Sequence, residues 1–364
     1  MLAPILVEVA RAFDVSSAAA GQLRTVTGLV AGVAALAFGR FGRGVALRDL
    51  LLLGTALLAL GSLGSAAAPS FAVFAIAQLP IGLGIALLVS AGAAAAADWA
   101  RPDERTRVLS WTLVGPAVAW VVGMPLVGAV AERSWRLAFL VLPLAASAIV
   151  AWSLSLCRKE QLPAVRPLVR LKDLLGDRAV GTWALAELLA SSAWAGTLVY
   201  AGALFVESYG SSPALTGLIL GGAAVAYLPG NFLAARVARA RSALALLAPL
   251  SLLGAAGVAV LGAVRPGETT SALVLAALVF VMAARTFAAG AYGLELAPDR
   301  RLAVMGVRAA ALQFGYLVGS GTGGLALLLA GYPALGAVFA ALFAAATACY
   351  VVLRGSPAAA PAVG

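Results

Sequence analysis

The chain has 364 residues, of which 63% are hydrophobic and 11% are charged, and its mean hydropathy is +1.02. A soluble core cannot accommodate so many apolar side chains, so the composition excludes a water-soluble domain and predicts an all-α integral membrane protein. Histidine is absent and only two cysteines occur, which excludes His-based catalysis, a His-ligated metal and a disulfide framework. We therefore expect no metal and no cofactor.

Apolar runs long enough to cross a bilayer recur from one end of the chain to the other. A run of about 20 residues covers about 30 Å as a helix, and a helix leaves no backbone group unbonded in hydrocarbon. In chain order, the predicted spans are Ala19–Phe38, Leu50–Ala68, Phe71–Ala97, Val108–Val130, Leu137–Leu156, Ala179–Val206, Ala214–Ala235, Ala243–Val264, Ser271–Leu294, Ala303–Ala330 and Ala334–Leu353. A shorter apolar stub, Leu2–Phe13, precedes them; at about 18 Å it does not cross.

The net charge of +10 is distributed unevenly along the chain. Counting the stub as the first span, most of the 25 Lys and Arg residues lie after every second span, including Arg308, or in the tail at Arg354. Basic loops stay on the cytoplasmic side, so we predict a cytoplasmic C-terminus and no nucleic-acid partner. The high Ala, Gly, Leu and Arg content indicates a bacterial inner (plasma) membrane.

The second half of the chain is similar to the first. A shift of 196 residues (235 − 39) aligns Gly39-Arg40-Phe41-Gly42-Arg43 with Ala235-Arg236-Val237-Ala238-Arg239. The same shift aligns Pro102-Asp103 with Pro298-Asp299. In a membrane chain, a half-length repeat is typical of transporters that are built from two similar helical bundles around a central path.

The longest polar connection divides the two copies of the repeat. We predict an N-terminal bundle at 1–156, with spans one to six, a cytoplasmic linker at 157–178 and a C-terminal bundle at 179–364, with spans seven to twelve. The counterpart of the span that begins at Ala179 would begin before Met1, so the stub matches only part of a helix. We expect a translation start upstream of Met1. The alternative is a chain that has lost half of a path-lining helix.

Several motifs resemble those of the major facilitator superfamily, and within it the drug and sugar (arabinose-type) efflux branch. The family carries Gly-x-Leu-Ala-Asp-Arg-x-Gly-Arg-Arg after its second span, where this chain has Gly39, Arg40, Gly42 and Arg43. Gly39 stands where the family has Asp. The resemblance implies two six-helix bundles, here 11 full spans plus a half-helix, and a cytoplasmic gating loop at these four residues.

Two further motifs support the resemblance and also depart from it. The family's Arg-x-x-x-Gly-x-Gly in its fourth span appears with Gln78 in place of the arginine that proton-coupled members use. The fifth span is rich in glycine and proline, as in the family's antiporters, and its motif residues are Gly115, Pro116, Gly123, Pro125 and Gly128. Small residues permit close helix packing, and glycine and proline permit bending.

Two charged residues lie deep inside predicted spans, where a charge is costly and usually functional. Glu187 and Arg285 fall at similar depths in spans seven and ten, which line the central cavity in the family, so we predict that they pair. The pair is either purely structural or a coupling site at which Glu187 exchanges a proton while substrate competes for Arg285. Ser191 and Trp194 share the face of Glu187.

The remaining candidates for substrate contact are Gln78, Gln313 and Arg24. An aromatic wall with few polar groups suits a small amphipathic organic molecule. The chain lacks a Walker loop and a Ser/His/Asp set, so we predict no enzyme but a secondary transporter, acting as a monomer by alternating access. Export in exchange for protons is the preferred interpretation. An uptake carrier or uniporter on the same fold, and a non-transporting membrane scaffold, remain open.

Overall fold

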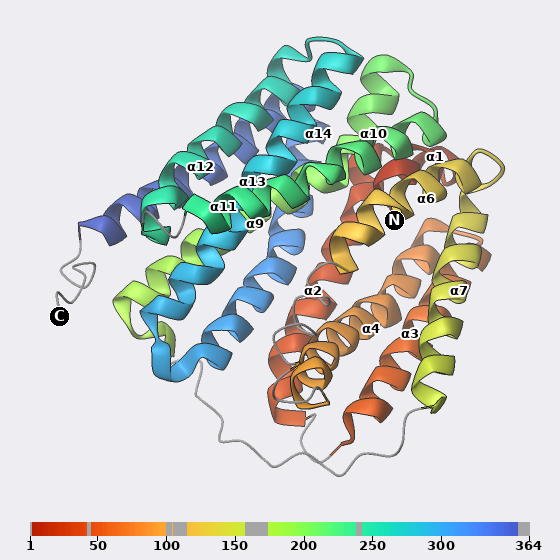
Figure 1. Cartoon of the computed structure of the whole chain (residues 1–364). Coiled ribbons are helices and arrows are strands. Elements are labelled where there is room, and N and C mark those ends of the chain that lie inside the picture. Colours follow the sequence, from red (N-terminus) through yellow and green to blue (C-terminus); the bar gives the residue numbers. More distant parts are fainter. Residues whose placement is uncertain are drawn as a thin grey trace. The chain divides into compact units, whose positions relative to one another are not determined.

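The computed structural model describes residues 2–41, 45–99, 104, 115–156, 174–237 and 242–355 (Figure 1). Across these ranges the regular structure is helical and contains no strand. Nine helices in the described chain are long and apolar enough to cross a membrane, and a shorter apolar helix covers Gly115–Ala131. The predicted all-α membrane fold is confirmed.

Spatial proximity divides the chain into two compact units. The first comprises Met1–Leu168 and Ala201–Gly221, and the second comprises Val169–Tyr200 and Gly222–Gly364. The end of helix α9 (Arg178–Tyr209) and most of helix α10 (Pro213–Val225) therefore group with the N-terminal unit. The division at 157–178 that the sequence indicates stays a prediction, and each unit is described by itself below.

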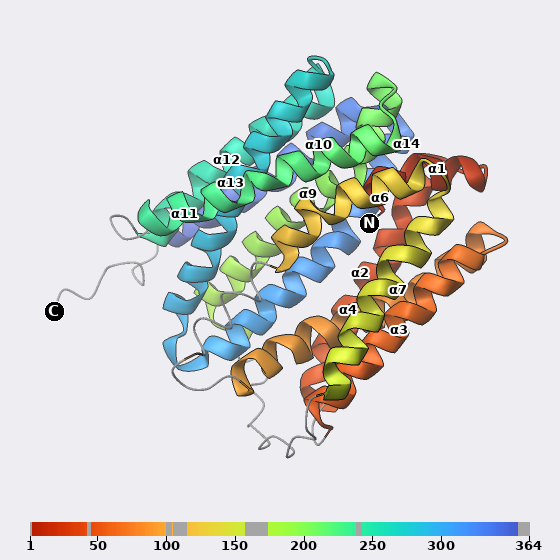
Figure 2. The same ribbon diagram turned by 45° about the vertical axis from the view of Figure 1, so that its right-hand side comes forward.

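The first unit begins with a short 3-10 helix, η1 (Ala3–Ile5), and α1 (Leu6–Ala12). Its longer helices are α2 (Ser17–Phe41), α3 (Leu47–Ala67), α4 (Phe71–Asp98), α6 (Gly123–Ala131) and α7 (Trp135–Leu156), with part of α10 (Pro213–Val225). Helix α3 packs on α4 and α7, and α2 packs on α4 (Figure 2). Residues 108–114 of the predicted span Val108–Val130 lie outside the described residues.

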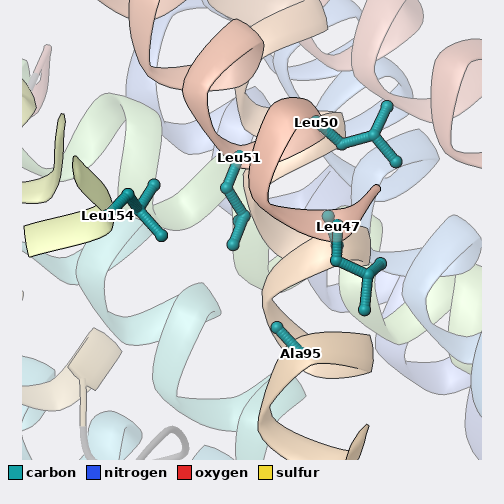
Figure 3. Close-up of a cluster of buried hydrophobic side chains, with 6 residues drawn as sticks. Leu47, Leu50, Leu51, Ala95 and Leu154 are labelled. Carbon is teal, nitrogen blue, oxygen red and sulfur yellow. The ribbon is translucent and has the colours of Figure 1, made fainter. Parts of the chain in front are cut away.

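Glycine and leucine fix the packing of α3 on its neighbours. A Cβ on Gly61 would lie 2.5 Å from Ile81 Cγ1 of α4, and one on Gly84 would lie 2.7 Å from the carbonyl oxygen of Gly54. At the other end of α3, leucines and alanines from α3, α4 and α7 form a buried apolar cluster (Figure 3): Leu47, Leu50, Leu51, Ala91, Ala95 and Leu154. Such close contact maximises dispersion attraction between helices.

Polar side chains form hydrogen bonds with backbone groups at the helix ends of the first unit. Arg136 Nη1 donates to the carbonyl oxygens of Ala66 and Ala68 at the end of α3, at 2.6 and 2.9 Å. The Glu132 carboxylate accepts the backbone N–H of Ala214 at the start of α10. This hydrogen bond, with one from Ser212, lowers the pKa of Glu132. Each contact satisfies a backbone group that the helix itself leaves unbonded.

The second unit contains most of α9 (Arg178–Tyr209), then α11 (Tyr227–Val237), α12 (Ala243–Ala259), α13 (Glu268–Leu296) and α14 (Arg301–Arg354). A π-helical turn, η2 (Val260–Val264), extends α12, and a 3-10 turn, η3 (Pro298–Arg300), precedes α14. Helix α12 packs on both α13 and α14, and α11 packs on α13.

Proline lies close to two breaks in the helices. The run predicted as Ala214–Ala235 is interrupted at Ala226, between α10 and α11, where Pro229 cannot donate to the carbonyl of Val225. The two runs predicted to meet near position 330 form two helices within the range labelled α14, joined by a kink at Ala330 and Gly331 ahead of Pro333, as the sequence analysis expected. Gly331 has φ +70°, a left-handed conformation that glycine adopts at no steric cost.

Candidate functional site: a buried charge cluster

Helices α9 and α13 bring Glu187 and Arg285 together. Arg285 Nη2 donates a hydrogen bond to Glu187 Oε1, and the two side chains are only 4% and 2% exposed. Each residue follows an alanine, Ala186 or Ala284, and lies inside an apolar helix, so the cost of removing these charges from water is large. The opposite charge and the hydrogen bond offset that cost.

Tyr350 of α14 completes this pair. Its hydroxyl donates to Glu187 Oε1 at 2.8 Å and accepts from Arg285 Nη2 at 2.7 Å, so the three side chains form a closed triangle. The side chain is fully buried. The sequence analysis did not single out Tyr350, because a tyrosine inside an apolar run carries no signal of its own.

Arg308 of α14 is the second residue that the sequence analysis missed. Its Nε lies 3.5 Å from Glu187 Oε2, and its Nη2 donates to the backbone carbonyl of Thr286 at 2.6 Å. Grouping Arg308 with the basic loop residues was wrong, since it lies inside α14 and approaches Glu187. The available signal was its position inside the predicted run 303–330.

The other two candidates on α9 lie close to this cluster along the helix. Ser191 is buried, and a Cβ on Gly315 of α14 would lie 2.8 Å from Ser191 Cβ, so Ser191 is packed against α14. Trp194 is half-buried. Gln313, also on α14, is half-buried as well.

Gln78 is held within the first unit by hydrogen bonds. Its Nε2 donates to Ser65 Oγ of α3 at 3.0 Å and to the carbonyl of Phe74 at 3.3 Å, and the side chain is buried. These contacts join α3 and α4. Arg24 of α2 is half-buried in the same unit.

The residues of the predicted gating loop are only partly described. Gly39 and Arg40 lie in the last turn of α2, and Gly42 and Arg43 lie outside the described residues. The loop's role therefore stays a prediction.

The antiporter-like motif divides into a packed part and an open part. A Cβ on Gly128 would lie 2.3 Å from the carbonyl oxygen of Pro213, and Pro125 lies against Gly221, so both motif residues contact α10. Gly115 and Gly123 have nothing within 4 Å of such a Cβ, and Gly115 and Pro116 are exposed. The motif thus includes one tight contact, between α6 and α10.

A row of glycines on α14 brings it close to α9 beside the cluster. A Cβ on Gly319 would lie 2.0 Å from the carbonyl oxygen of Ser192, and one on Gly323 would lie 3.0 Å from Tyr200. Tyr200 in turn donates to the carbonyl of Ser320 at 2.8 Å. These contacts fix α9 against α14 and so fix the position of Glu187.

The cluster is suited to binding and proton exchange within the membrane rather than to bond-breaking chemistry. A carboxylate held by two guanidinium groups and a phenol can gain or lose a proton and change its partners. Among the described residues, no group of three or more His, Cys, Asp or Glu side chains could hold a metal ion. A helical membrane protein with ionisable groups deep inside its helices has the features of a transporter.

Comparison with known proteins specifies the family. The family model of the Major Facilitator Superfamily matches residues 1–294, and the chain belongs to this superfamily of membrane transporters. It is therefore an integral membrane protein with a small-molecule substrate, and the family indicates a secondary transporter rather than an enzyme.

Solved structures with a similar fold support this assignment. A D-xylose-proton symporter is similar, with a TM-score of 0.79 at 14% identity over 96% of this chain and 92% of that one. A bacterial homolog of the human lysosomal transporter Spinster, inward-facing and unoccupied, gives a TM-score of 0.73 at 14% identity over 97% and 90%. At such low identity the likeness concerns the fold alone.

Proposed function

We propose that the protein exports a small amphipathic organic compound in exchange for protons, by alternating access, as a member of the drug and sugar efflux branch. The observation that carries this proposal is the buried cluster of Glu187, Arg285 and Tyr350 in the second unit. An ionisable group so deep in a membrane protein is usually retained for coupling or substrate binding.

The proposed cycle follows from the contacts of Glu187. Substrate would bind while Glu187 is deprotonated, separating Arg285 from the carboxylate and bonding to that carboxylate in its place. A proton that reaches Glu187 from the other side would remove the charge that holds the substrate and would expel it. Because substrate and proton would not occupy the carboxylate together, their movements would be coupled as an exchange.

The surroundings of this cycle are part of the proposal. Ser191, Trp194 and Gln313 would contact substrate near Arg285, and Arg24 is a further candidate for substrate contact. The four loop residues Gly39, Arg40, Gly42 and Arg43 would gate the cytoplasmic side. The protein would act as a monomer in a bacterial inner membrane, with its C-terminus in the cytoplasm.

The contacts of Gln78 argue against a coupling role for this position. In the family's proton-coupled members an arginine stands here. Gln78 is neutral, and its amide donates hydrogen bonds to Ser65 and to the carbonyl of Phe74. Any proton coupling in this chain would therefore depend on Glu187. Without coupling at Glu187, the same fold would act as a uniporter or uptake carrier.

Transport in everted membrane vesicles tests the proposal, with a panel of fluorescent dyes as the transported probes. We expect an imposed proton gradient to drive dye into wild-type vesicles, and Glu187→Gln to abolish this gradient dependence because glutamine cannot exchange a proton. Asp49→Asn, which changes a carboxylate at the start of α3, is the matched control and should retain it.

The same assay separates the alternatives. Full proton-driven movement in Glu187→Gln would refute the coupling role, and gradient-independent movement in the wild type would indicate a uniporter. No movement of any compound in a broad panel would favour the non-transporting scaffold.

A further inference from the structure

The buried cluster on α9, α13 and α14 carries more positive than negative charge. Arg285 and Arg308 both approach the carboxylate of Glu187, and the fourth member, Tyr350, is an uncharged phenol. Two guanidinium groups and one carboxylate leave an excess of one positive charge among the described side chains that meet here.

The excess charge resides on Arg308. The Arg285 guanidinium is 4% exposed and makes a hydrogen bond to Glu187, so these two groups neutralise each other away from solvent. The Nε of Arg308 is 3.5 Å from Glu187 Oε2, which is longer than a good hydrogen bond, and 23% of this side chain is exposed. Arg308 is thus both the less completely neutralised and the more accessible of the two arginines.

The backbone of α13 holds Arg308 in a fixed position. Its Nη2 is bonded to the carbonyl of Thr286, and its Nη1 lies beside Gly290, where a Cβ would be only 3.1 Å away. The absence of a side chain at Gly290 leaves the room that the guanidinium occupies. A positioned cation of this kind loses little conformational entropy on binding a ligand.

Within the described part of the chain, the cluster also leaves two of its donors without an acceptor. The buried Nε atoms of Arg285 and of Arg308 have no hydrogen-bond partner among the described residues. The hydrogen bonds from Arg285 and Tyr350 both reach Glu187 Oε1, while Oε2 lies 3.5 Å from Arg308 Nε, and arginine has no acceptor of its own. A ligand that completes this cluster must therefore bring negative charge and acceptor oxygens.

We propose that Arg308 binds an anionic group, a carboxylate or a phosphate, on the transported compound. Guanidinium groups bind such oxyanions through paired, charge-assisted hydrogen bonds, which fits the charge excess and the two donors that lack an acceptor among the described residues. The inference rests on the proposed transport function and narrows its substrate from an amphipathic compound to an organic anion. Because a proton on Glu187 would favour the anion, the two would move in the same direction, which is the uptake alternative on the same fold. Arg308 then determines specificity, while Glu187 and Arg285 serve coupling.

Ligand-dependent thermal unfolding of the full chain tests this inference. The protein is placed in phosphatidylcholine nanodiscs, whose lipid has no net charge, so that no anionic lipid competes with the added solute. The probes are benzoate, phenylacetate and phenyl phosphate, each beside a neutral or cationic counterpart of similar shape: benzamide, phenylacetamide and benzylamine. We expect at least one anion to raise Tm and its uncharged or cationic counterparts to have no effect.

Two arginine variants assign the effect to Arg308. Arg308→Gln removes the excess charge and should weaken anion binding by about tenfold or more, because the positive partner is lost in a partly buried site. Arg300→Gln removes an exposed charge in the turn before α14 and should leave binding unchanged. Equal anion binding by wild type and Arg308→Gln, or no Tm shift with any of the anions, would overturn the inference.

Removing the negative charge of the cluster, in place of a positive one, gives a second measurement. Glu187→Gln raises the excess from one positive charge to two, so anion affinity should increase about tenfold or more. The double variant Glu187→Gln/Arg308→Gln should return it toward the wild-type value. Anion affinity that falls in a folded Glu187→Gln protein would also overturn the inference; should this variant not fold, the Arg308 comparison decides alone.

The binding and transport experiments can refute the two proposals independently of each other. Anion binding at Arg308 without transport would leave this inference standing and would refute the transport function. Proton-driven movement of a neutral or cationic compound, with no anion bound, would refute the inference and leave the transport function standing.

Discussion

At the scale of single residues, the protein concentrates unusual chemistry in one place. The cluster joins Glu187, Arg285, Arg308 and Tyr350, and three of these four side chains are almost inaccessible to solvent. A buried ion pair is stable only when its remaining hydrogen-bonding groups are satisfied, which is what the Tyr350 hydroxyl does. That hydroxyl is therefore expected to contribute more than a hydroxyl bonded to a neutral group.

Replacing Tyr350 by phenylalanine tests this residue-scale expectation. We expect Tyr350→Phe to lower the free energy of unfolding by about 1.5–3 kcal/mol, because both partners of the lost hydroxyl are charged. Tyr200→Phe loses a bond to the neutral carbonyl of Ser320 and should cost about 0.5–1.5 kcal/mol. Thermal unfolding of both variants in nanodiscs makes the comparison, and a Tyr350→Phe protein as stable as wild type would contradict it.

At the scale of helices, close approach of backbones determines where the charged groups meet. Helix α14 lies against α9 through Gly315, Gly319 and Gly323, and this contact sets the distance between Glu187 and the residues of α14. With little hydrophobic driving force between helices in lipid, van der Waals contact of this kind provides much of the association energy. The packing of α9 on α14 therefore holds the side chains of the cluster in position.

A methyl group added at this contact should separate the helices. We expect Gly319→Ala to destabilise the protein by about 1–3 kcal/mol, since the new Cβ would lie 2.0 Å from the backbone oxygen of Ser192. Gly222→Ala on α10 is the control: nothing lies within 4 Å of its Cβ, and helix propensity should make it neutral or slightly stabilising. Equal unfolding temperatures for the two variants would rule out a tight α9–α14 contact.

At the scale of the whole molecule, the arrangement of basic residues predicts how the chain sits in the membrane. Most lysines and arginines follow every second span, and this pattern orients membrane proteins with those loops in the cytoplasm. By the same rule, the Arg-x-x-Arg motifs of the two half-length repeats, at Arg40 and Arg236, are both predicted to face the cytoplasm.

Reporter fusions test this orientation. A green fluorescent protein fused after Gly364 should fluoresce, and alkaline phosphatase fused at the same position should be inactive, because the first folds in the cytoplasm and the second requires export. The opposite pattern would show that the basic loops face outward.

The sequence by itself determined the membrane class, the family and most helix positions, because hydropathy and motif order are properties of successive residues. It also indicated that Glu187 and Arg285 pair, since a charge in an apolar run needs a partner at the same depth. Only the tertiary structure added Tyr350 and Arg308, and only it gave Gln78 its partner Ser65. Which side chains meet depends on how each helix is rotated about its axis and how closely it packs, and contacts between residues far apart in the chain decide both.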